Sequence, residues 1–167
     1  LFTDPHYQLQ DTLLVKAGNP KQLQSYEDIA KDESIKLAIM SGTVNLNYAR
    51  KAGIKDSQIV QVPDTTSQLQ AVRTGRADAA VGTQLTMRGL AEKAGDQVEA
   101  TDNFKDDPAN TGYGALAFRP EDKALRDAVN AELKKWLGSE EHLKTVEPFG
   151  FDRSNITDKT AEELCSA

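Results

Sequence analysis

The sequence has few of the residues from which catalytic and metal sites are built. It contains one cysteine and two histidines in 167 residues, and the histidines, His6 and His142, lie far apart in the chain. There is no nucleophile elbow, no glycine-rich phosphate loop and no spacing typical of metal ligands. The sequence therefore predicts a protein that is not an enzyme and that holds no metal or other cofactor.

Charge and hydropathy exclude two further classes. The formal net charge is −6, and Lys and Arg are scattered singly, so no basic stripe exists to follow a nucleic acid. No apolar run approaches the ~20 residues that a membrane-spanning helix needs. We therefore expect no nucleic-acid partner and no membrane span within this sequence.

The two ends of the sequence raise separate questions. The chain begins with Leu1 rather than Met, which leads us to expect a removed leader or a longer parent. Its single cysteine, Cys165, stands close to the other end. An odd cysteine in an exported protein indicates a missing disulfide partner or a free thiol, and an inert thiol in the tail is an equal alternative.

Strand-like apolar runs alternate with helix signals through most of the chain. The predicted strands are 12–16, 35–40, 57–62 and 77–81. Ser25 and Asp64 are predicted helix N-caps, and Gly53 and Gly75 are predicted to end helices. Such alternation is typical of an α/β fold with a parallel sheet flanked by helices, in which ligands bind where the carboxyl ends of strands meet helix N-termini.

After residue 118 the pattern becomes helical. Apolar residues over 125–137 recur at 3.6-residue spacing and predict an amphipathic helix that ends at Gly138. Ser139 is predicted to cap a second helix. From Asp152 onward the chain is polar, and we expect it to lie on the surface.

Ser41, Gly42 and Thr43 form the first candidate ligand site. They follow the strand at 35–40 and precede a helix, where several backbone N–H groups lack partners and can bind an anion. Gly42 allows close approach, and the Thr43 hydroxyl adds a donor. The alternative is that Ser41 or Thr43 merely caps its own helix, and the spacing does not decide between the two.

Gly82, Thr83 and Gln84 occupy the equivalent position after the strand at 77–81, so both segments are expected at one rim of the sheet. Here the alternative, a helix N-cap at Thr83, is favoured by the pattern alone.

Two other polar features have simpler interpretations. His6 lies beside Pro5 and Tyr7, and we expect a surface or packed loop histidine there. The acidic segment 102–108 lacks the glycine of a calcium-binding loop and is expected to be solvated.

Several segments, in order, resemble the periplasmic solute-binding proteins of amino-acid-type ABC importers (family 3). The matching segments are "FTDPHY", "YEDIAKD", "IKLAIMSGT", "LQAVRTGRADAAV" and "GYGALAFRPEDKALRDAVNAEL". In that family two α/β lobes, joined by two crossing strands, close over a small molecule. The resemblance implies a periplasmic-binding-protein-like α/β fold for this chain.

The resemblance also implies a division of the chain. Residues 1–10 would approach the hinge, residues 11–117 would form the second α/β lobe with both hinge strands, and 113–118 would be the returning strand. Residues 118–167 would form the C-terminal helices and the tail, which dock on the first lobe. Most of the first lobe is absent from this sequence, so a first-lobe segment is expected upstream or as a separate chain.

The family's ligand contacts can be carried over to matching residues. Its Gly-Thr turn binds the carboxylate of the ligand through backbone N–H groups and the Thr hydroxyl, which makes Thr43 the first-choice contact. Members that bind α-amino acids place Asp where this sequence has Thr83. Because Thr83 has no charge to hold a primary ammonium, the resemblance implies a ligand without that group, or a cation that is held elsewhere.

The tail "VEPFGFDRSNITDKTAEELC" and the segment "GTQLT" resemble most the subgroup that binds ectoine and hydroxyectoine, which are cyclic zwitterions with a delocalised amidinium. This implies a periplasmic, or membrane-anchored extracytoplasmic, protein that presents a small zwitterionic solute to the membrane permease of an ABC importer. The alternatives are a polar amino acid-binding protein, a periplasmic dehydratase-like enzyme of the same fold, and the sensing module of a receptor.

Overall fold

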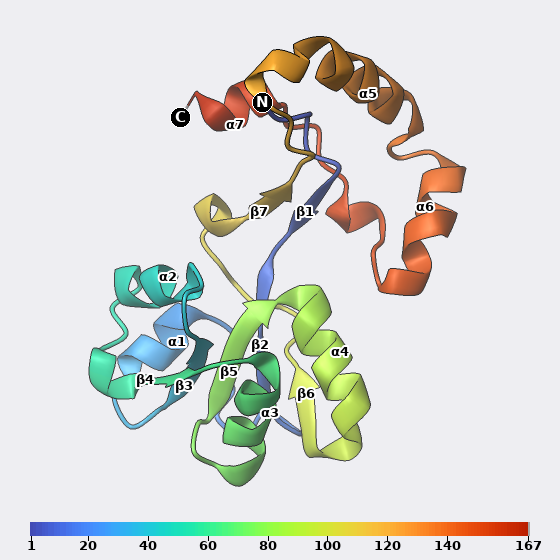
Figure 1. Ribbon diagram of the computed structural model, residues 1–167. Helices are drawn as coiled ribbons and strands as arrows, with labels where there is room; N and C mark the ends of the chain where they lie inside the picture. Colours follow the sequence, from blue (N-terminus) through green and yellow to red (C-terminus); the bar gives the residue numbers. More distant parts are fainter. Residues whose placement is uncertain (167) are drawn as a thin grey trace. The chain divides into compact units, whose positions relative to one another are not determined.

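The computed structural model describes residues 1–166, which form two compact units (Figure 1). The sheet unit comprises residues 10–110, and the helical unit joins residues 1–9 to the residues from 111 onward. The chain thus passes between the units after Leu9 and again after Asn110. Residues 111–117, which the resemblance groups with the second lobe, belong to the helical unit.

The sheet unit alternates strands and helices, as the sequence predicts. Its elements are β2 (Asp11–Lys16), α1 (Tyr26–Lys31), β3 (Leu37–Met40), α2 (Asn45–Lys51), β4 (Ile59–Val62), α3 (Thr65–Thr74), β5 (Ala79–Thr83), α4 (Gln84–Ala94) and β6 (Val98–Ala100), with 3-10 turns at Asp56–Gln58, Gly95–Gln97 and Pro108–Asn110. The strands form one sheet in the order β4-β3-β5-β2-β6. The α/β fold class is confirmed.

Strand β2 departs from the predicted parallel arrangement. Strand β3 is parallel to both of its neighbours, β4 and β5, but β2 is antiparallel to both β5 and β6. The reason is that no helical crossover precedes β2: it enters the sheet at the edge where β5 ends, with Asp11 opposite Thr83. The sheet is therefore mixed.

Side chains alternate between two hydrophobic cores along each strand. Leu13 and Val15 of β2 pack on one face with α1 and α2, whereas Leu14 packs on the other face with α3 and α4. The alternation follows from the two-residue period of a strand. Both faces of the sheet are covered, which explains the nearly continuous apolar runs of β3 and β5.

The helix ends predicted at Ser25, Asp64 and Gly75 are confirmed. Ser25 accepts a hydrogen bond from the Asp28 backbone N–H, and Asp64 accepts one from that of Ser67. Gly75 ends α3 in the left-handed conformation, with φ of +75°. These caps fix where α1 and α3 begin and end.

The helical unit contains two short strands and three helices among its described residues. They are β1 (Tyr7–Leu9), β7 (Gly112–Gly114), α5 (Lys123–Trp136), α6 (Glu140–Val146) and α7 (Ala161–Cys165), with 3-10 turns at Pro120–Asp122, Glu147–Phe149 and Arg153–Asn155. Strand β7 is shorter than the strand predicted at 113–118 and pairs with β1 antiparallel. Ser139 caps α6 as predicted, by accepting the His142 backbone N–H.

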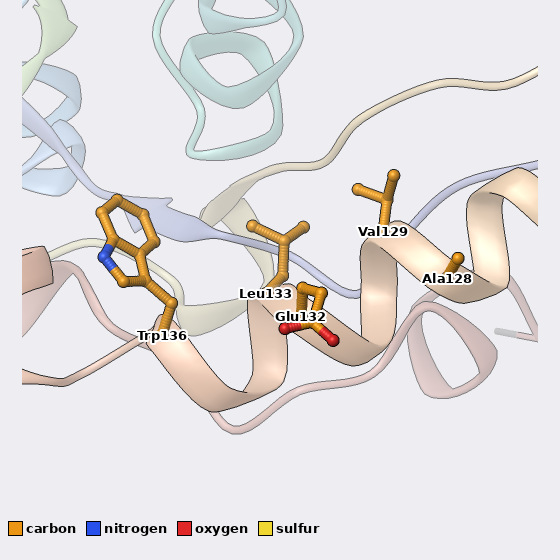
Figure 2. Close-up of a pocket in the computed structure, with 5 residues that line it drawn as sticks. All are labelled: Ala128, Val129, Glu132, Leu133 and Trp136. Carbon is orange, nitrogen blue, oxygen red and sulfur yellow. The ribbon is translucent and has the colours of Figure 1, made fainter.

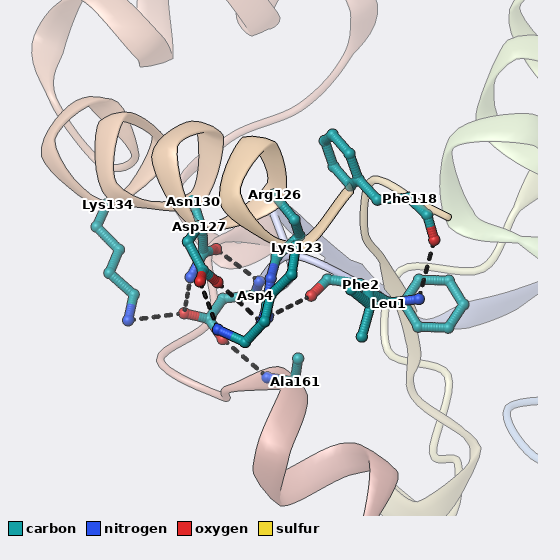
Figure 3. A network of polar contacts seen from close by, with 10 residues as sticks. All are labelled: Leu1, Phe2, Asp4, Phe118, Lys123, Arg126, Asp127, Asn130, Lys134 and Ala161. Carbon is teal, nitrogen blue, oxygen red and sulfur yellow. Dashed lines mark hydrogen bonds and ion pairs between the residues drawn. The ribbon is translucent and has the colours of Figure 1, made fainter. Parts of the chain in front are cut away.

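Asp4 connects the start of the helical unit to its helices (Figure 3). Its carboxylate contacts the Lys134 ammonium at 2.9 Å and accepts hydrogen bonds from the Asn130 side chain and the Ala161 backbone N–H. The Asp4 side chain is only 15% exposed. Residues from three distant parts of the sequence thus meet at one carboxylate.

Candidate functional site

The two candidate segments lie at the same edge of the sheet in the sheet unit. The parallel pairing of β3 with β4 and β5 brings the carboxyl ends of all three strands together. Ser41, Gly42 and Thr43 follow β3 directly, and Gln84 follows β5. The start of β2 lies at this edge too, because Asp11 is paired with Thr83.

The turn at residues 41–44 presents free backbone amides. The Ser41 N–H is used, since it donates to the Val62 carbonyl at 2.9 Å. Within residues 1–166 the N–H groups of Gly42 and Val44 have no hydrogen-bond partner. Gly42 has φ of +81°, and open space surrounds the position of a Cβ there. Two backbone donors are therefore available at this turn.

The Thr43 hydroxyl serves the turn itself in this structure. Its Oγ1 donates to the Met40 carbonyl at 2.8 Å, while its backbone N–H lies 3.4 Å from the same oxygen. It does not cap α2, whose N-cap residue is Val44 and has no side-chain cap. To donate to a ligand, this hydroxyl would have to give up its hydrogen bond to the Met40 carbonyl.

The second candidate segment, residues 82–84, belongs to a strand and a helix and does not form a separate turn between them. Gly82 and Thr83 are the last residues of β5, and Gln84 is the first of α4. The Thr83 hydroxyl lies 2.9 Å from that of Thr86 and makes no cap hydrogen bond. A Cβ on Gly82 would come within 2.7 Å of the Met87 methyl carbon, so a side chain at this position would require the end of the flexible Met87 side chain to shift.

Sequence reasoning missed Asp11. Its carboxylate accepts hydrogen bonds from the Asn45 side chain and from the Tyr26 hydroxyl, the latter at 3.2 Å. Asn45 begins α2, directly after the 41–44 turn. The signal was present in the sequence, because the two-residue period places Asp11 on the same face as the core residues Leu13 and Val15.

Burial, together with the nearby Asp106 carboxyl, raises the pKa of Asp11 to about 6, against the lowering effect of the hydrogen bonds from Tyr26 and Asn45. The pKa of Tyr26 is also raised, first by burial and then by Asp11. Burial likewise raises the pKa of Asp106. Asp11 therefore changes its charge in mildly acidic solution.

The acidic segment 102–108 is more structured than predicted. Asp106 is partly buried and accepts a hydrogen bond from the Asn110 side chain at 2.6 Å. Asp107 forms an ion pair with Lys51 of α2 at 2.9 Å. The segment is thus attached to α2, next to the Asp11 cluster, and is not simply solvated.

The histidines and the cysteine belong to the helical unit. His6 packs edge-on against Tyr7, with ring centroids 4.8 Å apart, in agreement with the predicted packed loop histidine. The His142 ring packs against Trp136 at an interplanar angle of 57° and accepts a hydrogen bond from the Gly138 backbone N–H. Cys165 is exposed and free.

The described residues offer neither a cluster of metal ligands nor a membrane-spanning helix. No group of three or more His, Cys, Asp or Glu side chains within residues 1–166 could hold a metal ion. In the same range, every helix is too short or too polar to cross a membrane.

Helix α5 leaves its apolar face uncovered within the helical unit (Figure 2). None of its residues is buried, and Leu125 is 57% exposed. The residues that line this face around a shallow depression are Ala128, Val129, Glu132, Leu133 and Trp136. The predicted amphipathic helix is therefore present without a partner for its apolar side.

Comparison with known proteins shows clear similarity to curated relatives. No family model matches the chain. The probable amino-acid ABC transporter periplasmic-binding protein y4tE of Sinorhizobium fredii is 33% identical over 174 residues, which cover 99% of this chain and 57% of the relative. The chain thus spans less than two thirds of that relative's length.

Solved structures give a similar result. EhuB in complex with hydroxyectoine is 33% identical, with a TM-score of 0.80, over 99% of this chain and 64% of EhuB. The ancestral cationic amino acid solute-binding protein AncCDT-1 is 26% identical, with a TM-score of 0.71, over 89% of this chain and 61% of its own. AncCDT-1 is also described as a precursor of cyclohexadienyl dehydratase.

Proposed function

We propose that the chain belongs to the periplasmic solute-binding proteins of amino-acid-type ABC transporters and that it captures ectoine or hydroxyectoine for import. The likeness to EhuB, which was solved with hydroxyectoine, carries this proposal. Both the sequence identity and the TM-score are higher for EhuB than for AncCDT-1, a binder of cationic amino acids. This difference supports a cyclic zwitterion over an ordinary amino acid.

We assign the carboxylate of the ligand to the 41–44 turn. The unpartnered N–H groups of Gly42 and Val44 are the donors, and the open space at Gly42 admits the ligand. The Thr43 hydroxyl turns from the Met40 carbonyl to the ligand, and Ser41 adds its exposed hydroxyl. Several donors on one carboxylate give both affinity and orientation.

The other end of the ligand is assigned to Gly82, Thr83 and Gln84. Thr83 and Gln84 are partly exposed, and neither carries a charge. Neutral oxygens suit a delocalised amidinium better than a compact ammonium, which is strongly hydrated and requires a full opposite charge. The absence of an acid at position 83 therefore supports ectoine over an α-amino acid.

A dehydratase-like enzyme is the second candidate. It is supported by the description of AncCDT-1 and by the raised pKa of Asp11, which suits acid–base chemistry. The Asp11 carboxylate is, however, engaged by Tyr26 and Asn45, which supports a binding role. A change in the mass of a solute after incubation with the protein would establish the enzyme.

The proposed partners follow from the proposed function. A solute-binding protein of this family delivers its ligand to the membrane permease of an ABC importer, which places this protein outside the cytoplasmic membrane. The uncovered apolar face of α5 supports a first-lobe segment as a further partner.

Calorimetry tests the ligand assignment. The natural protein that contains this chain is titrated with ectoine, hydroxyectoine, glutamine and arginine under one set of conditions. We expect ectoine or hydroxyectoine to bind most tightly, and no ligand to be chemically altered when it is recovered. Tighter binding of glutamine or arginine would contradict the ligand and favour a polar amino acid-binding protein.

A further inference from the structure

The first residues of β2 contact both strand-to-helix junctions of the sheet unit. The backbone of Asp11 is paired with Thr83, and the carbonyl of Gln10 accepts the Gln84 N–H at 2.9 Å. The side chain of Asp11 reaches the other junction, where Asn45 donates to it. One short segment therefore connects the 41–44 turn with the start of α4.

The 41–44 turn is fixed at both of its ends. At its start the Ser41 N–H donates to the Val62 carbonyl, and at its end the Asn45 side chain donates to Asp11 and lies 3.3 Å from the Tyr26 hydroxyl. Between these anchors, Val44 is 58% exposed, and the N–H groups of Gly42 and Val44 are unpartnered within residues 1–166. The direction of these amides therefore depends on the two anchors.

The second anchor is shielded from water. Asn45 is 8% exposed and Tyr26 is 2% exposed. A hydrogen bond to an ionised carboxylate in such surroundings is stronger and more directional than one to a neutral group. Burying a carboxylate at position 11 opposes folding. An apolar residue there would extend the apolar face formed by Leu13 and Val15 without that cost.

We infer that Asp11 is a positioning residue for ligand binding: through Asn45, its ionised carboxylate holds the free amides of the 41–44 turn in the orientation that receives the ligand's carboxylate. This inference rests on the proposed function. Asp11 itself acts through Asn45 and does not touch the ligand.

The inference predicts that ligand affinity depends on the charge of Asp11. The titratable groups around it are Tyr26 on α1, Tyr48 on α2 and Asp106 after β6, with Lys51 of α2 close to Asp106. Burial and Asp106 raise the pKa of Asp11 to about 6. A carboxylate–amidinium zwitterion keeps its charges around this pH, so a change in affinity there comes from a change in the protein and not in the ligand.

The binding experiment compares four proteins from about pH 5 to about pH 8, a range that brackets this change of charge. They are the natural protein, Asp11→Asn, Asn45→Ala and the control Asp102→Asn, which makes the same chemical change at an exposed position of the sheet unit. The ligands are ectoine and hydroxyectoine. We expect the affinity of the natural protein to fall at low pH and Asp11→Asn to bind about tenfold more weakly at high pH, with no pH dependence of its own.

The double variant Asp11→Asn/Asn45→Ala separates positioning from direct contact. If Asp11 acts through Asn45, the double variant loses no more affinity than the single variant that binds the ligand more weakly. Additive losses, an affinity that rises on protonation, or the same pH profile in Asp11→Asn as in the natural protein would each overturn the inference. Both histidines, His6 and His142, are present in all four proteins, so the difference between the profiles isolates Asp11.

A second readout needs no ligand. In NMR spectra of the natural protein, the side-chain amide of Asn45 and the backbone amides of Gly42 and Val44 should shift together with a midpoint near the pKa of Asp11, about 6. In Asp11→Asn these shifts should vanish and the turn should become more mobile on the nanosecond timescale. Shifts that persist in Asp11→Asn overturn the positioning role, whereas failure to bind any zwitterion with these shifts intact overturns only the proposed function.

Discussion

The Asp4 carboxylate accepts the backbone N–H of Ala161 at 2.9 Å, so a residue in the first loop of the helical unit holds the start of α7 (Figure 3). The same carboxylate contacts the Lys134 ammonium at 2.9 Å, and the Asp4 side chain is 15% exposed. Because α7 has only five residues, it cannot be stable by itself. Its position therefore depends on this contact and on its own capping box.

Replacement of Asp4 should destabilise the helical unit. Asp4→Asn removes the charge that pairs with Lys134 and weakens the bond to Ala161, and we expect a loss of about 1 to 3 kcal/mol. Urea unfolding followed by the fluorescence of Trp136, the single tryptophan of the chain, reports this unit directly. Asp158→Asn, at an exposed position of the same unit, should change stability by less than about 0.5 kcal/mol.

The effect of Asp4 should also depend on pH. Burial opposes its ionisation, but the bonds from Lys134, Ala161 and Asn130 outweigh burial and lower the pKa of Asp4. A group with a lowered pKa stabilises the fold above its unfolded value, about 4, and loses this contribution as the pH falls through its folded value. The stability difference between the natural protein and Asp4→Asn should therefore shrink below about pH 4. A difference that is constant across this range would contradict the ion pair as its source.

Gly82 should tolerate a methyl group once Met87 has shifted. In Gly82→Ala the new methyl would lie 2.7 Å from the Met87 methyl carbon, the end of a flexible side chain, and we expect its displacement to cost about 1 kcal/mol or less in denaturant unfolding. The double variant Gly82→Ala/Met87→Ala should lose less stability than the sum of the losses in the two single variants, because the close contact with the Met87 methyl is absent. Gly89→Ala is the control: nothing lies near its Cβ, so this helix substitution should stabilise by about 0.5 to 1 kcal/mol.

The local parts of the fold were predictable from the sequence. Ser25, Asp64 and Ser139 each cap the helix that follows, and Gly75 ends α3, because capping depends on residues only three or four positions apart. The two candidate segments also fall at one edge of the sheet, as parallel strands require.

The long-range parts were not predictable from local patterns. The reversed direction of β2 depends on its pairing with β5, some 70 residues later in the chain, where Asp11 meets Thr83. The Asp11 cluster likewise needs Asn45 and Tyr26 to be brought together by two helices. The end of β5 was predicted too early, because pairing with β2 extends the strand through Thr83.

Thr43 is the sharpest test of the proposed carboxylate site. Thr43→Val removes the hydroxyl but keeps the shape, and we expect binding of ectoine to weaken by about 1 to 3 kcal/mol, the cost of an unsatisfied polar partner. Thr43→Ser should retain most of the affinity. Thr74→Val is the matched control, because it removes a similar hydroxyl-to-carbonyl bond, from Thr74 to Gln70, at the end of α3. An unchanged dissociation constant in Thr43→Val removes this residue from the site.

The apolar face of α5 gives a prediction about the first lobe. Trp136 lies on this face beside Leu133, so its emission depends on whether the face is covered (Figure 2). When the chain is mixed with the separately produced first-lobe segment of the natural protein, we expect the Trp136 emission to shift to shorter wavelength, because burial removes water from the indole. Val129→Lys places a charge on the same face and should abolish the shift, since an unpaired buried charge is costly. Ala131→Lys adds the same charge to an exposed position off this face and should leave the shift intact. A shift that survives Val129→Lys would mean that the first lobe does not dock on this side of α5.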